Sequence, residues 1–213
     1  MDTRAATPTL RYIIDHLVNE PTSCAAMHPE GEKRHAGMQV SPYEGRLLQW
    51  LLQISGAKNV LEVGTFMGYS TAWMAEGIAE GGQITSLEFD AEHAEQAATH
   101  LAPYSHVAVV QGDGLAWIKN YNGAPFDFMF IDAMKKSYMD YLDAAMQHLV
   151  KGAWVVADNS LLFGNLAGEP NPGRTSEEAK KVMHEINLRL TNGSEFNGVL
   201  LPTPEGMTVG VKL

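Results

Sequence analysis

Polar side chains that could hold a metal ion follow two apolar segments of the chain. Asp132 comes directly after the apolar run 126–131, and Asp158 and Asn159 come directly after the run 153–157. If the two runs are adjacent parallel strands, these side chains meet at one edge of the sheet. Two carboxylates and an amide oxygen are typical ligands of a hard divalent cation. The spacing therefore predicts a site for Mg²⁺, with Mn²⁺ or Ca²⁺ as alternatives.

This metal site requires a turn of the backbone after the second strand. Successive side chains of a strand point to opposite faces, so Asp158 and Asn159 can bind one ion only if the chain turns there. Lys135 follows Asp132 by three residues. A nearby dication disfavours the ammonium form, so we expect Lys135 to accept a proton and its neighbour Lys136 to be solvated. The alternative is that Asp132 caps a helix and that Asp158 and Asn159 form a plain turn.

Residues 60–70 have the pattern of a strand, a loop with glycines and a helix. They read Val-Leu-Glu-Val-Gly-Thr-Phe-Met-Gly-Tyr-Ser and include Glu62, Gly64 and Gly68. In open α/β sheets, ligands bind at such turns, where glycine permits close approach of the backbone. The pattern matches neither the dinucleotide fingerprint nor the phosphate loop. The acidic Glu62 suits a ligand that carries a positive charge.

Two further segments are typical of a nucleoside site. Glu88, at the end of the second predicted strand, could accept hydrogen bonds from ribose hydroxyls. Gly112 and Gly114, after the third, leave space for a flat adenine ring. An adenosyl ligand with a cationic tail matches S-adenosylmethionine. The alternative is that the glycines serve only the turns and that Glu88 lies on the surface.

The elements that must position these residues alternate along the chain. Runs of apolar residues predict parallel strands buried on both faces, at residues 59–63, 83–88, 107–111, 126–131 and 153–157. Amphipathic spacing and cap residues predict helices at residues 9–18, 43–54, 70–80, 90–101, 115–121, 138–149 and 176–190. This alternation predicts an α/β fold, a mostly parallel sheet with helices on both faces.

The two ends of the chain depart from this alternation. Residues 199–201 and 207–213 predict an antiparallel hairpin at one edge of the sheet. Residues 20–37 contain two prolines and two glycines, and we interpret them as a mobile loop or lid over a site. The length of 213 residues fits one domain. We therefore expect residues 1–213 to form a single domain, with 1–40 as an N-terminal helix and lid-like loop.

Charge and composition restrict the partners. The chain has 15 Lys and Arg against 25 Asp and Glu, a net charge of −10, which disfavours nucleic acid and anionic membranes. Its apolar runs are much shorter than the roughly 20 residues that cross a bilayer. The N-terminus lacks the pattern of a secretory signal, and the single cysteine, Cys24, cannot form an internal disulfide. These features predict a cytoplasmic protein that binds neither nucleic acid nor membrane.

At these positions the sequence resembles the cation-dependent class I S-adenosylmethionine O-methyltransferases, the group of the caffeoyl-coenzyme A and catechol enzymes. The resemblance begins near residue 38 and rests on residues 38–45, 61–70, 131–138 and 158–164 and on a terminal motif, Pro-x-x-Glu-Gly-Met-x-Val. It implies a Rossmann-like, seven-stranded methyltransferase sheet with an antiparallel last strand, and a homodimer.

The resemblance also implies roles for individual residues. The S-adenosylmethionine site would contain Val40, Glu62, Gly64, Thr65, Ser70, Glu88, Gly114 and Asp132. The metal ligands would be Asp132, Asp158 and Asn159, and the catalytic base would be Lys135.

Two departures from the family pattern concern the methyl acceptor. Met134 stands where the family often has a second Asp, and Leu162 and Phe163 stand where the plant enzymes carry Trp and Asn. The first departure removes any substrate contact that the second Asp makes, and the second favours a free catechol over a coenzyme A ester. We expect acceptor choice to lie in the loop-like stretches 20–37 and 161–174.

The predicted function is divalent-metal-dependent transfer of a methyl group from S-adenosylmethionine to a hydroxyl of a small catechol-like acceptor. One alternative is an NAD-dependent oxidoreductase on a related fold, which predicts a Gly-x-Gly-x-x-Gly loop that this chain lacks. Another is a non-catalytic S-adenosylmethionine-binding regulatory protein, which predicts loss of metal or base residues that are present. Methylation of a protein or nucleic acid is a third, and the acidic charge disfavours nucleic acid.

Overall fold

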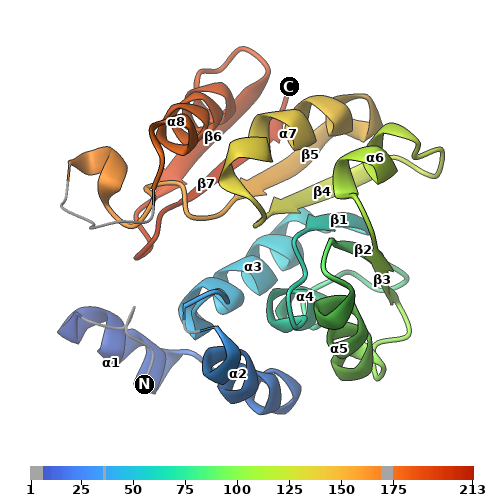
Figure 1. Cartoon of the computed structure of the whole chain (residues 1–213), viewed down its shortest axis with the longest axis vertical. Coiled ribbons are helices and arrows are strands. Elements are labelled where there is room, and N and C mark those ends of the chain that lie inside the picture. The colour runs from blue at the N-terminus through green and yellow to red at the C-terminus, as the bar shows by residue number, and fades with distance from the viewer. Residues whose placement is uncertain (1–6, 36, 169–174) are drawn as a thin grey trace. The chain divides into compact units, whose positions relative to one another are not determined.

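The structure is a computed structural model that describes residues 7–35, 37–168 and 175–213. Within them lie seven strands: β1 (Asn59–Val63), β2 (Gln83–Glu88), β3 (Val107–Gln111), β4 (Phe126–Ile131), β5 (Leu149–Ala157), β6 (Phe196–Leu201) and β7 (Met207–Lys212). They form one mixed sheet in the order β3-β2-β1-β4-β5-β7-β6, and Figure 1 labels them. The predicted α/β fold with an antiparallel last strand is confirmed.

The chain divides into two compact units. The first comprises the described parts of Met1–Lys58 and Thr65–Gly112, and the second comprises Asn59–Gly64 and the described parts of Asp113–Leu213. No helix within the described residues is long and apolar enough to cross a membrane.

The first unit contains the parallel strand pair β2–β3 and several helices. These are α1 (Pro8–Leu17), α2 (Thr22–Arg34), α3 (Pro42–Ser55), α4 (Tyr69–Ala75) and α5 (Ala91–Leu101). The predicted helices 9–18, 43–54 and 90–101 are confirmed, with small shifts at their ends. The prediction that every strand is buried on both faces is wrong for β3, which is partly exposed along its length because it is an edge strand.

The bounds of α3 follow from its cap residues. The Ser41 side chain accepts a hydrogen bond from the Glu44 backbone N–H, and the Glu44 carboxylate accepts one from the Ser41 backbone N–H at 3.0 Å. This reciprocal capping box satisfies N–H groups that a helix start leaves without intrahelical partners. Gly56 ends the helix in the left-handed conformation. Leu48 and Leu52, one turn apart, are buried in the core of this unit.

Residues 20–37 form mainly a helix, α2, so the prediction of a mobile loop is wrong. Pro21 stands at the N-cap, where a missing N–H costs little, and Pro29 is accommodated inside the helix. Residue 36 and residues 1–6, part of the predicted lid-like segment 1–40, lie outside the described residues.

Packing explains why α2 is a helix despite its proline and glycine. Its buried residues are Cys24, Met27 and Gly31, at spacings of three and four that share one helical face. A Cβ at Gly31 would overlap the side chain of Gln39. This glycine therefore allows close packing, whereas the composition alone suggested flexibility.

The helix predicted at 70–80 is shorter than expected. It ends at Ala75, and the N–H groups of Gly77 and Ile78 both donate to the Met74 carbonyl oxygen at 2.9 Å. A Cβ at Gly77 would come within 2.6 Å of the Gln49 carbonyl oxygen of α3. The chain turns here because Gly77 lets it pass close to α3.

The second unit contains the parallel strands β1, β4 and β5, followed by the antiparallel strands β7 and β6. Its helices are α6 (Gly114–Lys119), α7 (Tyr138–Ala145) and α8 (Glu177–Thr191). The predicted hairpin near the C-terminus is confirmed. The predicted helices 115–121 and 176–190 are found with small shifts at their ends.

The boundary between α7 and β5 differs from the prediction. The helix predicted at 138–149 ends at Ala145, and β5 begins at Leu149, four residues before the predicted start at 153. Gly152 has a φ of 84° inside β5. A glycine with positive φ permits an irregularity within a strand, so the strand continues through it.

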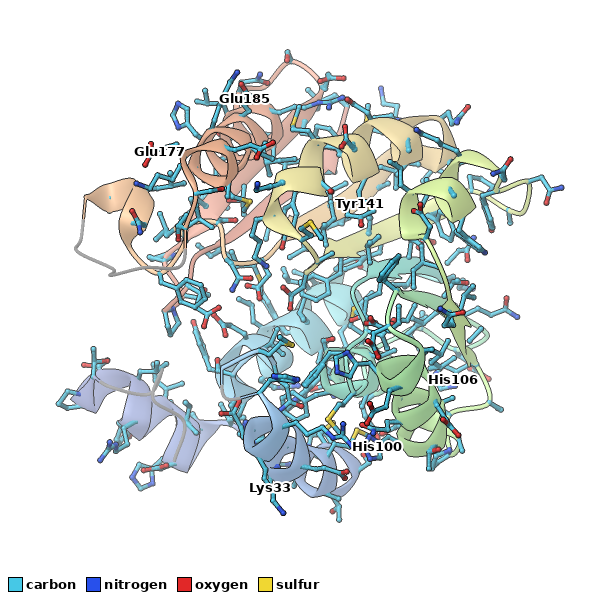
Figure 2. The ribbon with its side chains drawn as sticks, in the orientation of Figure 1. Lys33, His100, His106, Tyr141, Glu177 and Glu185 are labelled. Carbon is cyan, nitrogen blue, oxygen red and sulfur yellow. The ribbon has the colours of Figure 1, made fainter. Side chains whose placement is uncertain are left out.

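Close packing of α8 on the hairpin requires two glycines. A Cβ at Gly198 of β6 or Gly210 of β7 would overlap or crowd the Leu190 carbonyl oxygen of α8. The inner face of α8 is apolar, with Met183 and Ile186 buried. Its outer side carries charged side chains, among them Glu177 and Glu185, which Figure 2 labels.

Candidate functional site

Asp132 and Asp158 lie side by side at the ends of β4 and β5. The parallel register pairs Ile131 with Ala157, so the next residues along the two strands are neighbours. The Asp158 backbone N–H donates to the Ile131 carbonyl oxygen at 3.0 Å, which extends the ladder by one residue. Both carboxylates act electrostatically on Lys135. The structure thus brings the two predicted acids to one edge of the sheet, within the second unit.

The chain turns at Asn159, as a shared cation site requires. β5 ends at Ala157, and Asn159 has a φ of 52°, in the left-handed region that asparagine tolerates better than most residues. Its carbonyl oxygen accepts a hydrogen bond from the Leu162 N–H at 2.8 Å. Because the strand has ended, the rule that successive side chains face opposite ways no longer separates Asp158 from Asn159.

Lys135 begins a single 3-10 turn, η1 (Lys135–Ser137), and its Nζ is fixed by two partners. It donates to Asp132 Oδ1 at 2.9 Å and to the Tyr138 hydroxyl at 2.9 Å. Burial lowers the pKa of the Lys135 amine, but Asp132, Tyr138 and Asp158 raise it, and the net shift of this pKa is upward. In this arrangement Lys135 is an ammonium group held by Asp132.

Lys136 is exposed, as predicted, and it also has an ion-pair partner. Its Nζ lies 2.6 Å from Glu178 Oε2 at the start of α8. Both side chains remain largely exposed, and exposed ion pairs of this kind contribute little to stability. Lys136 therefore faces a different partner from Lys135 and still serves as a control for it.

The donor set at this edge fits a hard divalent cation. Asp132 and Asp158 supply carboxylate oxygens. Asn159 Nδ2 donates to the Glu205 carboxylate, so its amide oxygen is the atom left for a cation. Within the described residues, no three His, Cys, Asp or Glu side chains are grouped as metal ligands. The amide oxygen of Asn159 is therefore needed to complete a set of three ligands.

In the first unit, Glu88 at the end of β2 holds the loop that carries Thr65. Its Oε2 accepts hydrogen bonds from the backbone N–H groups of Thr65 at 3.1 Å and Phe66 at 2.7 Å, and its Oε1 accepts one from Asp90 N–H at 2.9 Å. The Thr65 hydroxyl also lies 2.5 Å from the Ser86 hydroxyl. Each carboxylate oxygen can accept more than one hydrogen bond, so Glu88 retains capacity for ribose hydroxyls.

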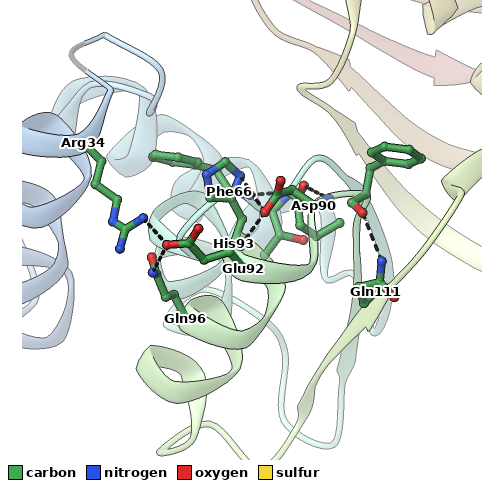
Figure 3. Close-up of polar contacts among 10 residues, drawn as sticks. Arg34, Phe66, Asp90, Glu92, His93, Gln96 and Gln111 are labelled. Carbon is green, nitrogen blue, oxygen red and sulfur yellow. Dashed lines mark hydrogen bonds and ion pairs between the residues drawn. The ribbon is translucent and has the colours of Figure 1, made fainter.

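The surroundings of Phe66 fix this loop further, as Figure 3 shows. Phe66 has a φ of 49°, a strained value for a bulky residue, and its ring meets that of His93 edge-on at 4.8 Å. Asp90 caps α5 by accepting from the His93 N–H at 2.9 Å, which lowers the pKa of Asp90. Arg34 of α2 pairs with Glu92 of α5 at 2.6 Å. The His93 ring of α5 thus packs against the strained loop, and the Arg34–Glu92 pair joins α2 to α5.

The remaining predicted cofactor residues lie in both units. In the first, Val40 is buried just before the cap of α3, and Ser70 is the second residue of α4. In the second, Glu62 is fully buried in β1, and Gly114 is the buried first residue of α6.

Close packing requires a glycine at position 64, which the sequence alone did not reveal. Gly64 has a φ of 98°, and a Cβ there would overlap the Asp132 carbonyl oxygen. The Asp132 backbone N–H in turn donates to the Val63 carbonyl oxygen at 2.9 Å. A side chain at position 64 would therefore push the end of β1 away from Asp132, a predicted cation ligand.

Three residues that the sequence reasoning did not single out adjoin the predicted ones. Tyr138 is fully buried against Lys135, and Glu205 is buried against Asn159. Phe89 follows Glu88 with 79% of its surface exposed, an unusual position for a large apolar side chain. Glu205 belongs to the terminal Pro-x-x-Glu-Gly-Met-x-Val motif, but the motif did not indicate what this residue does.

The stretch 161–174, expected to select the acceptor, begins with a strained turn. Leu162 and Phe163 have φ values of 49° and 57°, both in the left-handed region. Phe163 and Met134 are exposed in the second unit. Residues 169–174 lie outside the described residues.

Comparison with known proteins adds a family and its relatives. A family model described as O-methyltransferase matches residues 18–213. A catechol O-methyltransferase of Niastella koreensis is 33% identical, over 94% of this chain and 90% of that protein. A catechol O-methyltransferase of Mycobacterium tuberculosis is 32% identical, over 89% of this chain and 86% of that protein.

Solved structures are similar over nearly the whole chain. An O-methyltransferase from Bacillus cereus in complex with SAH has a TM-score of 0.81 at 26% identity, covering 95% of this chain and 96% of that one. The O-methyltransferase TomG from Streptomyces achromogenes, in complex with SAM, has a TM-score of 0.82 at 26% identity, covering 100% and 99%.

Proposed function

The chain belongs to the O-methyltransferase family and is an S-adenosylmethionine-dependent enzyme, and we propose that it methylates a hydroxyl of a small catechol-like acceptor with the help of a divalent cation. The observation that carries the proposal is the position of Asp132 and Asp158 at adjacent strand ends. Lys135 donates a hydrogen bond to Asp132, and both carboxylates act electrostatically on its amine. Hard oxygen ligands beside a buried amine suit the binding and deprotonation of a vicinal diol.

We propose that the cofactor is S-adenosylmethionine and that it contacts the predicted residues Val40, Glu62, Gly64, Thr65, Ser70, Glu88, Gly114 and Asp132. The bonds from Glu88 to the loop at Thr65 support this, because they place a carboxylate beside a glycine-flanked turn at a strand end. Glu88 would accept hydrogen bonds from the ribose hydroxyls. The buried Glu62 supplies negative charge that favours a cationic ligand.

The proposed ligands of the cation are Asp132, Asp158 and Asn159, with Mg²⁺ as the preferred ion and Mn²⁺ or Ca²⁺ as alternatives. When bound, a divalent cation would lower the pKa of the acceptor hydroxyl and offset the carboxylate charge that holds Lys135 in its ammonium form.

Lys135 is the proposed base. Its Nζ, as the free amine, would take the proton of the acceptor hydroxyl while the oxygen forms a bond to the methyl carbon and the carbon–sulfur bond breaks. Tyr138 and Asp132 fix the position of Nζ through their hydrogen bonds. A base held in place lowers the entropic part of the barrier.

The acceptor is proposed to be a free catechol. Met134 and Phe163 expose apolar surface that suits a flat ring and offers no charge for a coenzyme A phosphate. The net charge of −10 likewise disfavours a polyanionic acceptor.

The proposal is tested by measuring methyl transfer to a panel of catechols and matched monohydric phenols, with and without a chelator. We expect turnover of catechols only, loss of turnover with the chelator, and recovery when Mg²⁺ or Mn²⁺ is added back. Equal methylation of monohydric phenols in the presence of chelator would contradict the proposal.

We also propose that the protein is a cytoplasmic homodimer. Trp50 and Ile54, one turn apart on α3 and each about half exposed, form an apolar strip that could be covered by a second copy. Light scattering on the intact chain tests the dimer, which a chain of monomeric mass would contradict.

A further inference from the structure

Glu205 is a buried carboxylate directly behind one proposed cation ligand. It lies in the turn between β6 and β7 with 3% of its surface exposed, and it accepts a hydrogen bond from Asn159 Nδ2. Carboxylates are rarely buried this completely unless a specific interaction holds them. The position of Glu205 therefore calls for a role.

The chemistry of the amide group determines what this bond does. An asparagine side chain has donors on its nitrogen and acceptors only on its oxygen, while an ionised carboxylate only accepts. The nitrogen of Asn159 must therefore face Glu205, and the reverse orientation would set oxygen against oxygen. Because the amide is planar, its oxygen is then presented on the other side, away from Glu205.

The backbone holds the two residues in this relationship. The Ser160 N–H donates to the Gly206 carbonyl oxygen at 2.8 Å, and the Leu161 N–H donates to the Glu205 carbonyl oxygen at 2.9 Å. These two bonds join the turn that follows the proposed ligands to the turn that carries Glu205. These backbone hydrogen bonds therefore hold Asn159 and Glu205 next to each other.

A third element, α8, also holds these segments together. Asn187 of α8 donates from Nδ2 to the Ser160 carbonyl oxygen at 2.8 Å, and its Oδ1 accepts from the Thr208 hydroxyl at 2.7 Å. The Ser160 hydroxyl accepts from the Thr208 N–H at 3.0 Å. The final hairpin and α8 thus both brace the turn after β5.

We propose that Glu205 is a positioning residue that turns the amide oxygen of Asn159 toward the cation and adds negative charge behind it. This inference rests on the proposed cation site. Glu205 is not itself a ligand together with Asp132 and Asp158, because the described residues contain no cation-binding group of three such side chains. Residues that hydrogen-bond to metal ligands typically contribute about tenfold to hundredfold in metal affinity.

The test measures Mn²⁺ binding to the full chain, without acceptor, from the electron paramagnetic resonance signal of free Mn²⁺. We expect Glu205→Ala to weaken binding about tenfold to hundredfold. Glu205→Gln keeps an oxygen that can accept from Asn159, so it should lose less. Glu195→Gln is the matched control, since Glu195 pairs with Arg189 on the surface and should leave affinity unchanged.

A double-variant comparison separates positioning from general support of the fold. In an Asn159→Ala background, Glu205→Ala should cause no further loss of Mn²⁺ affinity, because the amide that it orients is gone. An equal further loss would overturn the inference, and so would unchanged affinity in Glu205→Ala alone. If the unaltered chain bound no Mn²⁺, the proposed cation site would fail and this inference with it.

Discussion

Gly64 and Asp132 approach so closely that a Cβ at position 64 would overlap the Asp132 carbonyl oxygen. Sequence patterns of this type are usually interpreted through the cofactor, for which glycine leaves room. Here the same glycine also lets β1 end beside β4. One residue therefore connects the proposed cofactor loop to the proposed cation ligand through packing alone.

Gly64→Ala should disturb both stability and cation binding. Gly152→Ala is the matched control, because Gly152 also has a positive φ but no atom within 4 Å of a Cβ built on it. The control should lower the free energy of unfolding by about 1–2 kcal/mol. Gly64→Ala should lower it by about 1–3 kcal/mol more, since backbone atoms must move.

Chemical denaturation and Mn²⁺ titration of both variants check this expectation. Only Gly64→Ala should weaken Mn²⁺ binding, through displacement of Asp132. Equal stability and affinity in the two variants would show that the overlap is relieved without cost.

Lys135→Ala should remove most methyl transfer to a catechol while leaving cofactor affinity nearly unchanged. The reason is that Lys135 contacts Asp132 and Tyr138, and its proposed role is to accept the acceptor's proton. General bases typically contribute about 10²- to 10⁴-fold in rate. Turnover and calorimetric binding of S-adenosylmethionine measure the two effects separately.

Lys136→Ala provides the control for this lysine. Its partner is Glu178 on the surface, so turnover should stay near that of the unaltered enzyme. Similar losses in both variants would indicate that the charge of the segment matters, and would reject Lys135 as the specific base.

The sequence predicted the parts of this protein that depend on local pattern. The strand ends at Ile131 and Ala157 could be located from apolar runs. Parallel pairing of the two strands then implied that Asp132 and Asp158 are neighbours. The demand for a turn at Asn159 followed from strand geometry in the same way.

The parts that depend on tertiary packing could not be predicted. Gly31 suggested a flexible loop, but its lack of a side chain accommodates Gln39 and keeps α2 helical. The bond between Asn159 and Glu205 joins residues 46 positions apart, and no local pattern encodes it. Lys136 is exposed as predicted, but a single sequence does not indicate that Glu178 lies next to it.

Glu88→Gln should weaken S-adenosylmethionine binding. Glu88 accepts two hydrogen bonds from the loop N–H groups of Thr65 and Phe66, and a glutamine would lose the charge and turn a donor toward one of its partners. Hydrogen bonds to charged groups contribute about 1.5–3 kcal/mol, which corresponds to roughly tenfold to hundredfold in affinity.

Glu92→Gln is the control for Glu88, and Figure 3 shows its place on α5. Glu92 pairs with Arg34 on the surface, so its replacement should leave cofactor affinity unchanged. Isothermal titration of both variants decides the matter, and unaltered affinity in Glu88→Gln would remove Glu88 from the proposed ribose site.

Cys24 should resist alkylation in the native protein. It is fully buried in α2, and burial raises the pKa of its thiol to about 12, with the nearby charges of Glu20 and Glu76 adding to the rise. An unfolded thiol has a pKa near 8.5. At pH 8.5 the reactive thiolate should therefore be about a thousandfold scarcer in the folded chain.

The sign of the linked stability effect follows from the same shift. A folded pKa above the unfolded pKa favours folding fully below about pH 8.5, and this contribution is lost as the pH rises toward 12. Mass spectrometry after iodoacetamide treatment at pH 8.5, with and without guanidinium, measures the protection directly. A Cys24→Ser/Ser194→Cys double variant, whose new thiol is exposed, should react at similar rates in both conditions. Rapid labelling of Cys24 in the native protein would mean that α2 detaches readily, because in the packed helix the thiol is buried and stays protonated.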